Sequence, residues 1–234
     1  STLLASSAAS DVYKRQYLDN SATTRVDAQV QELMKKLMDV DFGNPSSRHQ
    51  KGVVAEGYIK EARQKIAATL KVDPKEFIIT SGGTESNNMA LTGTALAAKR
   101  KGNHIITTAV EHPSVKATAS FLEEQGFRIT FLSVDSRGQI SLEELKEALT
   151  PDTILVSIMY VNNEIGTIQP IEEAAKLVHA TVPGAVFHVD AIQAYGKVLI
   201  RPKQQGIDLL SVSSHKFHGP KGAGFLYCLS LIHI

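Results

Sequence analysis

A lysine among small polar residues and a carboxylate that ends an apolar run are the most chemically suggestive features of the sequence. Lys216 stands in Ser213-Ser-His-Lys-Phe-His-Gly219, and Asp190 closes Phe187-His-Val-Asp190. A lysine amine can form a Schiff base with a carbonyl compound. A carboxylate at the end of a buried strand costs free energy unless a cation or hydrogen-bond donors accompany it. Taken alone, a loop lysine is most often solvated, so neither residue identifies a site by itself.

A glycine-rich turn could bind an anion. Ser81-Gly-Gly-Thr-Glu85 follows the apolar run Phe77-Ile-Ile-Thr80 and leads at once into a helical pattern. Glycines let the backbone approach a ligand, and the first N–H groups of a helix attract an anion such as phosphate. The turn is not a Walker loop, because no Gly-Lys-Ser/Thr follows, and Gly-x-Gly-x-x-Gly is absent. A Gly-Gly turn before a helix is by itself more often structural than functional.

Two further turns carry polar side chains directly after apolar runs. His112 follows the run 104–108, and Asn163 lies in a turn that follows the run 153–160. The ordinary interpretation is a helix cap or surface residue for His112 and an Asn-rich turn for Asn163. His215 and His218 could suggest a metal site, but no third ligand is evident, and we predict no metal.

Together these features are far more specific than any one of them. A phosphate cradle, a histidine that can stack on a flat ring, a buried carboxylate and a loop lysine are what pyridoxal 5'-phosphate requires. The lysine forms the Schiff base, the carboxylate keeps the pyridine nitrogen protonated, and a helix N-terminus holds the phosphate. The sequence therefore predicts a pyridoxal-phosphate site.

The elements that must position these residues alternate along the chain. Short apolar runs alternate with helical patterns, which predicts an α/β fold with a mostly parallel sheet and helices on both faces. Ligands of such sheets bind beyond the carboxyl ends of the strands, where the polar residues above stand. The predicted strands are 77–80, 104–108, 128–134, 153–160, 185–189, 209–213 and 223–227, and the helices between them are 84–100, 114–125, 141–149 and 171–180.

Three predictions concern individual helices. One is a buried helix face formed by apolar residues at three- and four-residue steps, namely Val30, Leu33, Met34, Leu37 and Met38. Ser46 or Ser47 is available as the N-cap of a long helix that ends near Leu70. Ser141-Leu-Glu-Glu144 is typical of a capping box that opens a helix.

The composition excludes several classes of protein. The chain has 234 residues with 25 Lys+Arg against 24 Asp+Glu, a formal net charge of +1, which argues against nucleic acid as a direct partner. Cys228 is the single cysteine, so nothing implies an oxidising compartment. No stretch approaches the roughly 18 uninterrupted apolar residues of a membrane span. We expect a soluble cytoplasmic protein without a membrane partner.

The motifs, in their order and spacing, resemble the cysteine desulfurases, the NifS/IscS-like enzymes that use pyridoxal phosphate and share the aspartate-aminotransferase fold. The resemblance runs from about Tyr17 to Tyr227. The segments that carry it are Tyr17-Leu-Asp-Asn-Ser-Ala-Thr-Thr24, Phe42-Gly-Asn-Pro-Ser-Ser47, Thr80-Ser-Gly-Gly-Thr-Glu-Ser86, Val161-Asn-Asn-Glu-Ile-Gly166, His188-Val-Asp-Ala191, Ser214-His-Lys216 and Gly219-Pro-Lys-Gly222.

The resemblance implies a role for each candidate residue. Lys216 would be the Schiff-base lysine, and Asp190 would be the partner of the pyridine nitrogen. Gln193 would hydrogen-bond the phenolic oxygen of the ring. His112 would stack on the ring and shuttle protons, as suits an imidazole. Asn163 would contact the cofactor or the substrate carboxylate. The phosphate would be held by Gly83, Thr84, Ser213 and His215.

The implied reaction converts L-cysteine to L-alanine and an enzyme-bound persulfide, whose sulfur supplies iron–sulfur cluster assembly or tRNA thiolation. The implied partners are a second copy of the chain in a homodimer and a sulfur acceptor or iron–sulfur scaffold protein. Within the same fold, a selenocysteine lyase, a kynureninase or an aminotransferase is an alternative. A non-catalytic scaffold domain is an alternative of another class.

The sequence departs from the family pattern where the persulfide-forming cysteine and the arginine that clamps the substrate are expected, because that part of the family's chain has no counterpart here. Cys228 does not stand in for the nucleophile, since nothing near it supplies an electropositive, accessible setting. We therefore expect a fragment, inactive alone, that contains most of the cofactor domain. Its predicted parts are a disordered non-family leader, the cofactor domain and a non-family tail, at 1–16, 17–227 and 228–234.

Overall fold

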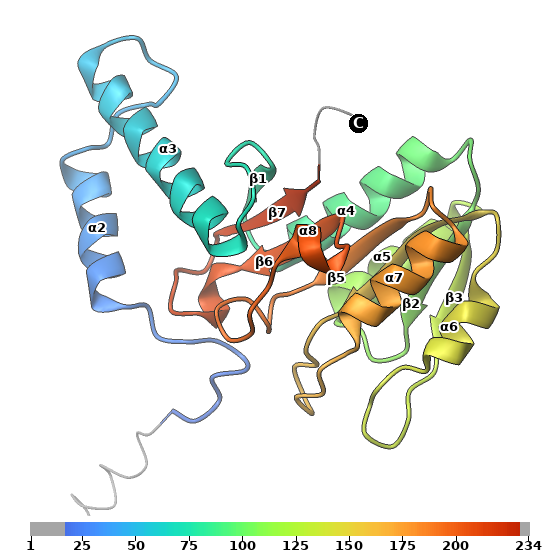
Figure 1. Ribbon diagram of the computed structural model, residues 1–234. Coiled ribbons are helices and arrows are strands. Elements are labelled where there is room, and N and C mark those ends of the chain that lie inside the picture. The colour runs from blue at the N-terminus through green and yellow to red at the C-terminus, as the bar shows by residue number, and fades with distance from the viewer. Residues whose placement is uncertain (1–16, 230–234) are drawn as a thin grey trace, which may run out of the picture.

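The computed structural model describes residues 17–229 of the chain. Seven strands of this part form one sheet, and Figure 1 shows helices packed against it. The strands are β1 Phe77–Thr80, β2 His104–Thr108, β3 Arg128–Leu132, β4 Thr153–Met159, β5 Val186–Asp190, β6 Leu209–Ser213 and β7 Gly224–Cys228. Their order across the sheet is β1-β7-β6-β5-β4-β2-β3. Strand β7 alone runs in the opposite direction to the other six strands of this described sheet. The predicted mostly parallel sheet is confirmed.

Helices cover both faces of the sheet. The helices of the described residues are α2 Ala28–Asp39, α3 Gln50–Leu70, α4 Gly83–Ala98, α5 Pro113–Glu124, α6 Leu142–Ala148, α7 Ile171–Thr181 and α8 Pro202–Gln205, with the 3₁₀ turn η1 Ser214–Lys216. Helices α4 and α5 pack together on one face, and α6, α7 and α8 lie on the other (Figure 1). Because the strands end at the same edge, this arrangement brings the loops that follow them together.

Successive side chains of the strands point alternately into two apolar cores, one on each face of the sheet. Ile105 of β2 belongs to the core that contains Leu91 of α4. The next residue, Ile106, belongs to the opposite core with Val178 of α7. Both isoleucines are fully buried. This period of two explains why two successive isoleucines of β2 are both buried, as expected of a strand covered on both faces.

Helix α3 begins later than predicted. Its N-cap is His49, whose Nδ1 accepts a hydrogen bond from the backbone N–H of Gly52 at 3.4 Å. The predicted caps Ser46 and Ser47 are instead part of a turn, because the Asn44 side chain accepts from Ser46 N at 2.9 Å. The prediction of Ser46 or Ser47 as N-cap was wrong, because the hydrogen bond from Ser46 N to the Asn44 side chain holds this segment in a turn before the helix begins.

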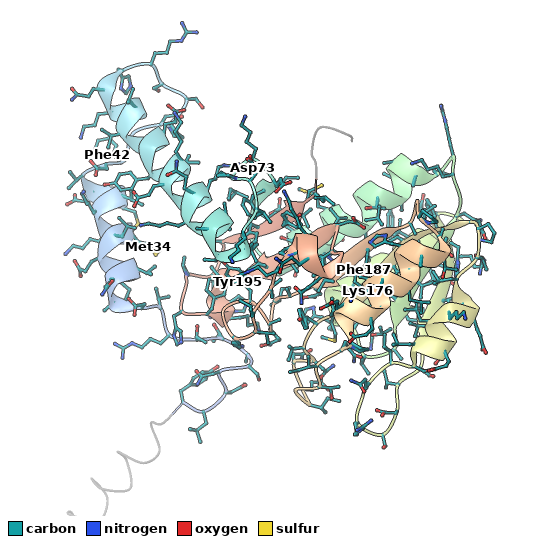
Figure 2. All side chains as sticks on the ribbon, in the orientation of Figure 1. Met34, Phe42, Asp73, Lys176, Phe187 and Tyr195 are labelled. Carbon is teal, nitrogen blue, oxygen red and sulfur yellow. The ribbon has the colours of Figure 1, made fainter. Side chains whose placement is uncertain are left out.

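Helix α2 has no buried residue, so the predicted buried face was wrong. Leu33 is 45% exposed and Met38 is 71% exposed. The helix lies beside α3 at one end of the molecule, away from the sheet, and Figure 2 shows its Met34 far from the core residue Phe187. Periodicity indicates that a helix is amphipathic, and it does not indicate what covers the apolar side.

The predicted capping box at α6 is half correct. Ser141 is the N-cap, and its Oγ accepts from Glu144 N at 3.2 Å. The Glu144 carboxylate does not return to the cap. It accepts from Ser133 N at 2.9 Å instead and so ties α6 to the end of β3. A carboxylate in the first turn of a helix can accept either from the backbone N–H of the N-cap residue or from a donor outside the helix, and the sequence motif alone does not determine which.

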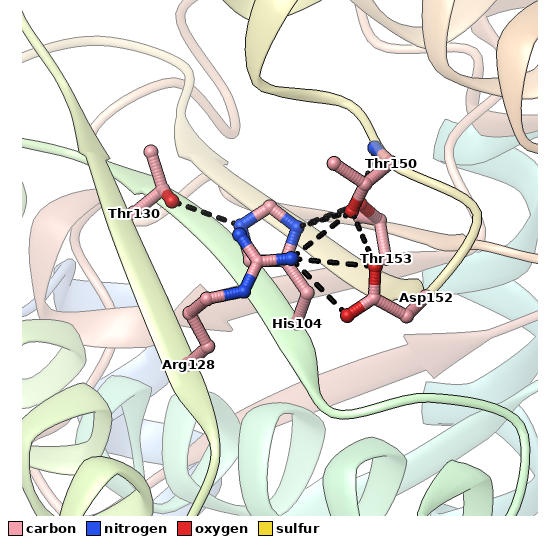
Figure 3. A network of polar contacts seen from close by, with 6 residues as sticks. All are labelled: His104, Arg128, Thr130, Thr150, Asp152 and Thr153. Atoms are coloured by element: carbon pink, nitrogen blue, oxygen red, sulfur yellow. Dashed lines mark hydrogen bonds and ion pairs between the residues drawn. The ribbon is translucent and has the colours of Figure 1, made fainter.

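The buried side chain of His104 links the three strands β2, β3 and β4 by hydrogen bonds near their amino ends. His104 Nδ1 lies 2.8 Å from Thr153 Oγ1, and its Nε2 lies 2.9 Å from Thr130 Oγ1 (Figure 3). Arg128 and Asp152 form an ion pair at 3.1 Å beside the ring. Burial, followed by the charge of Arg128, lowers the pKa of His104 to about 4. This network lies at the edge of the sheet opposite the carboxyl ends, so it serves the fold.

We expect acid to destabilise the protein through His104. The pKa of His104 falls from 6.5 to about 4 on folding, so stability is complete above pH 6.5 and is lost as the pH drops through 4. The difference corresponds to about 3 kcal/mol at about 1.36 kcal/mol per pH unit. Urea unfolding at pH 7 and pH 5 should show about 2 kcal/mol of this loss, because the remainder appears only below pH 5. His104→Asn should lose this part of the acid dependence, and an unchanged pH dependence in the variant would contradict the prediction.

The helices within residues 17–229 include none that combines the length and the apolar character needed to cross a membrane. The predicted leader 1–16 lies outside the described residues, and so do the last five residues of the predicted tail. Strand β7 extends to Cys228, one residue beyond the proposed boundary at Tyr227.

Candidate active site

A cavity of about 610 Å³ opens at the carboxyl ends of the strands. Its lining includes all nine residues that the sequence analysis singled out: Gly83, Thr84, His112, Asn163, Asp190, Gln193, Ser213, His215 and Lys216. These residues come from the last positions of β5 and β6 and from the loops and helix starts that follow β1, β2, β4, β5 and β6. The topology of the sheet therefore brings together side chains that are widely separated in the sequence.

Lys216 and Asp190 both face this cavity. Lys216 belongs to the 3₁₀ turn after β6, and its Nζ donates to the backbone oxygens of Ser21 at 2.6 Å and Ala22 at 2.8 Å. Burial, and then the nearby charge of Lys197, lowers the pKa of the Lys216 amine. A lowered pKa makes the neutral, nucleophilic amine more accessible.

Asp190 ends strand β5 and is 3% exposed. Its Oδ1 accepts from Ile192 N at 3.0 Å, and its Oδ2 accepts from Asn87 Nδ2 at 2.8 Å. Burial raises the pKa of this carboxyl, and the hydrogen bonds and the charges of His112 and Lys216 act in the opposite direction. The carboxylate is thus placed to bind a protonated ring nitrogen or another cation.

One end of the cavity is built for an anion. Helix α4 begins there at Gly83, and no side chain caps its N-terminus. A Cβ added to Gly83 would lie 2.1 Å from Ile192 Cδ1, so a larger residue here would require the Ile192 side chain to move. Gly82 has φ +150°, a conformation that favours glycine. The uncapped N–H groups beside Ser213 form a site suited to phosphate.

His112 is the N-cap of α5, directly before Pro113. Its Nδ1 accepts from Ser114 N at 3.1 Å and lies 2.8 Å from Ser114 Oγ. Both bonds fix the plane of the ring. Since proline favours the first position of a helix, the sequence His-Pro holds His112 at the point where the chain leaves β2. The ring is exposed on its cavity side, where a flat ligand could stack.

Gln193 and Asn163 line two other walls. Gln193 Nε2 donates to Ser21 O at 2.8 Å, and Gln193 Oε1 accepts from Lys197 Nζ at 3.2 Å. Asn163 faces the cavity, whereas its neighbour Asn162 shapes the turn. Asn162 Oδ1 accepts from the backbone N–H of Glu164 at 2.9 Å. The Asn-rich turn is therefore both structural, through Asn162, and part of the cavity, through Asn163.

The buried carboxyl of Glu111 stabilises the turn after β2 that contains His112. Glu111 is 3% exposed, and its Oε1 accepts from Thr108 Oγ1 and from Met159 N, each at 2.8 Å. Its Oε2 has no hydrogen-bond partner among the described residues. Burial, and then the charge of Asp190, raises the pKa of Glu111 to about 8. At neutral pH the group is mainly a neutral acid that holds residues 109–112 against β4.

Sequence reasoning missed part of the site. Asp19, Ser21 and Ala22 precede the first helix and line the cavity, and two of them bind Lys216 through backbone oxygens. The segment was noticed only as part of a motif, because a backbone acceptor leaves no trace in residue types. Asn87 was also missed. It lies one helical turn after Gly83, a spacing that places both residues on one face of α4.

Cys228 lies outside this cavity. The side chain is 3% exposed in β7, and burial raises the pKa of its thiol to about 11. Very little thiolate exists at neutral pH when the pKa is that high, so the thiol is a weak nucleophile.

The residues present fit a flat aromatic coenzyme that carries a carbonyl group and a phosphate. The close-packed Gly83 and the uncapped helix N-terminus supply the anion cradle. An amine of lowered pKa and a buried carboxylate face the same cavity. This combination can bind such a coenzyme covalently, neutralise its phosphate and hold a proton on its ring.

Comparisons with known proteins agree with this chemistry. Residues 16–232 match the family described as aminotransferase class-V. The chain is 51% identical over 214 residues to the putative cysteine desulfurase IscS 1 of Bacillus subtilis, covering 92% of this chain and 56% of that protein. It is 51% identical over 211 residues to the cysteine desulfurase IscS of Dictyoglomus turgidum, covering 90% and 53%.

Solved structures are similar as well. A NifS-like protein matches with a TM-score of 0.90 and 43% identity, covering 92% of this chain and 59% of that one. The structure described as SspA in complex with cysteine matches with a TM-score of 0.87 and 41% identity, covering 91% and 61%. The chain thus spans about half the length of the curated relatives it matches.

Proposed function

The chain belongs to the class-V aminotransferase family, and on that premise we propose that it is the cofactor domain of a pyridoxal-phosphate-dependent cysteine desulfurase. The single observation that carries the proposal is the convergence of Lys216, Asp190 and the anion cradle at Gly83 on one cavity. The names of the most similar relatives support the same activity.

In the proposed cofactor site, different lining residues contact different parts of the coenzyme. Lys216 would hold the cofactor covalently, and Asp190 would keep its ring nitrogen protonated. Gln193 would donate to the phenolic oxygen, and His112 would stack on the ring. The phosphate would rest on Gly83, Thr84, Ser213 and His215. When bound, the cofactor supplies an electron-accepting ring conjugated to the substrate's α-carbon.

The residues of the chain would then perform three tasks. Asp190 holds positive charge on the ring nitrogen by a buried ionic contact, which is stronger than it would be in water. Lys216 would hold the cofactor through its amine and, when that amine is free, would be placed to move a proton. Asn163, which also lines the cavity, would bind the cofactor or the carboxylate of the amino acid.

We further propose L-cysteine as the substrate, with L-alanine and enzyme-bound sulfur as the products. SspA, the similar protein whose structure is described as a complex with cysteine, supports an amino acid of this size in the cavity. Cys228 is buried in β7 and does not line the cavity. Because it is the single cysteine of these 234 residues, we propose that the sulfur-accepting thiol belongs to a part of the full-length protein outside them. A homodimer, a sulfur-acceptor or iron–sulfur scaffold protein as partner and a cytoplasmic location complete the proposal.

The test is cofactor binding followed by product analysis. Full-length protein incubated with pyridoxal phosphate should become yellow, and adding L-cysteine should release alanine and, with a thiol reductant, sulfide. Lys216→Ala is the control for both. Preference for selenocysteine would favour a lyase of the same family. A protein that binds no cofactor would overturn the proposal and favour a scaffold.

A further inference from the structure

A chain of hydrogen bonds beneath the cavity joins His112 to Asp190. His112 Nδ1 lies 2.8 Å from Ser114 Oγ, and Asn87 Nδ2 lies 3.0 Å from the same hydroxyl. Asn87 Nδ2 also donates to Asp190 Oδ2 at 2.8 Å. Asn87 is fully buried, and Ser114 is 8% exposed. Two residues without an assigned role therefore connect two that the proposed function uses.

The donor and the acceptor of each hydrogen bond in this chain, hereafter the bridge, can be assigned. The backbone N–H of Ser114, which can only donate, points at His112 Nδ1 at 3.1 Å. His112 Nδ1 must therefore accept, and the neutral ring carries its proton on Nε2. The Ser114 hydroxyl accepts from Asn87, so its own hydrogen is directed at the same nitrogen. Nε2 is then the ring nitrogen left to meet the cavity.

The orientation of the Asn87 amide depends on a charged Asp190. Both hydrogens of Nδ2 are used, whereas Asn87 Oδ1 is buried without a partner among the described residues. Rotating the amide would place Oδ1 against the carboxylate of Asp190, which is repulsive. In the observed orientation the Asn87 amide donates two hydrogen bonds, and its oxygen is the one group of the amide left unpaired within residues 17–229. Burial raises the pKa of Asp190, and the bond from Asn87 opposes that shift.

We propose that Ser114 and Asn87 are positioning residues that hold His112 as the Nε2–H tautomer toward the cavity and keep Asp190 ionised. The inference deepens the proposed function, on which the purpose of His112 and Asp190 rests. The bridge does not conduct protons between them, because an amide N–H does not release its hydrogen. His112 thus meets a ligand as a hydrogen-bond donor, and it can release the Nε2 proton only if Nδ1 gains one.

The test begins with the tautomer of His112 in the cofactor-free full chain. The chain is labelled with ¹⁵N-histidine, and the two ring nitrogens of His112 are assigned by comparison with His112→Gln. We expect Nδ1 to resonate as an unprotonated nitrogen and Nε2 as a protonated one. A ring protonated at Nδ1 alone would overturn the proposal. Because no cofactor is present, this result is independent of whether the chain is a desulfurase.

Variants separate positioning from folding. Ser114→Ala removes one hydrogen bond and should lower the ratio of Nε2–H to Nδ1–H tautomers about tenfold. Ser114→Thr should restore it. Thr118→Val is the matched control, because Thr118 is another buried hydroxyl of α5 and its hydroxyl donates to Asn88 Oδ1 and Ser114 O rather than to His112. An unchanged ratio in Ser114→Ala, or an equal change in Thr118→Val, would contradict the role of Ser114.

Asn87→Leu tests the other end of the bridge. The variant should shift the titration of the Asp190 carboxyl, followed by its ¹³C resonance, to higher pH than in the parent chain. The other groups that act on Asp190, namely Glu111, His112 and Lys216, are unchanged in the variant. A titration at the parent pH would overturn the role of Asn87. Cofactor binding, measured separately by colour, decides the proposed function.

Discussion

Replacing Lys216 with alanine should abolish covalent attachment of pyridoxal phosphate completely. Lys216 faces the cavity, and its amine has a lowered pKa because it is partly buried and lies near the charge of Lys197. A neutral amine is the form that attacks a carbonyl carbon. Reduction with borohydride converts the attachment into a stable bond. Mass spectrometry of the reduced full-length protein should therefore show the added cofactor mass on Lys216 and no addition in Lys216→Ala.

Two other lysines provide controls. Lys197 lies close to the cavity, and Lys221 lies in the same loop as Lys216. Lys197→Ala and Lys221→Ala should both retain the trapped cofactor. Lys216→Ala should still bind the cofactor weakly and reversibly, since the anion cradle at Gly83 is intact. A cofactor that remains trapped in Lys216→Ala would show that another amine is used and would remove the main support of the site.

Alkaline pH should destabilise the protein through Glu111. Folding raises the pKa of this carboxyl from 4.5 to about 8. The folded state therefore binds the proton more tightly than the unfolded chain, so the stabilisation is complete below pH 4.5 and is lost as the pH rises through 8. The change approaches about 5 kcal/mol at about 1.36 kcal/mol per pH unit. That is a large share of the total stability, about 5–15 kcal/mol, of an ordinary domain.

Glu111→Gln isolates this contribution. The amide oxygen can still accept from Thr108 and from Met159 N, and the side chain no longer titrates. Urea unfolding at pH 5, 7 and 8.5 should show that the parent loses stability with rising pH and that the variant loses much less. Glu85→Gln is the control, because Glu85 is exposed and its hydrogen bonds to Ser81 lower its pKa. Parallel pH profiles of parent and Glu111→Gln would refute the assignment.

The strands could be predicted because each is a short apolar run closed by turn residues. The runs 77–80, 104–108 and 209–213 coincide with β1, β2 and β6. The errors have physical reasons. The run 185–189 was ended one residue early because Asp190 is charged, yet this residue is the last of β5 and pairs with Ser211 of β6. Burial beside hydrogen-bond donors overrides the usual preference of aspartate for loops.

The candidate site could be located from side chains that follow strands, whereas its supporting contacts could not. Lys216 binds the backbone oxygen of Ser21 across a separation of 195 residues. The bond from Asn87 to Asp190 spans 103 residues. No local pattern encodes such distances, since they result from the order in which the strands join the sheet. The apolar face of α2 illustrates the same limit, because its pattern was correct and its burial was not.

The position of β7 has a consequence for how the molecule is assembled. Strand β1 lies at the border of the described sheet, where it pairs with β7, the strand furthest from it along residues 17–229. The Gly-Gly turn after β1 therefore gains its final support only after residue 228 has left the ribosome. Contacts between such distant parts of a chain form slowly. We expect the parallel strands to be protected from hydrogen exchange first during refolding, and the amides of 77–84 to be protected last.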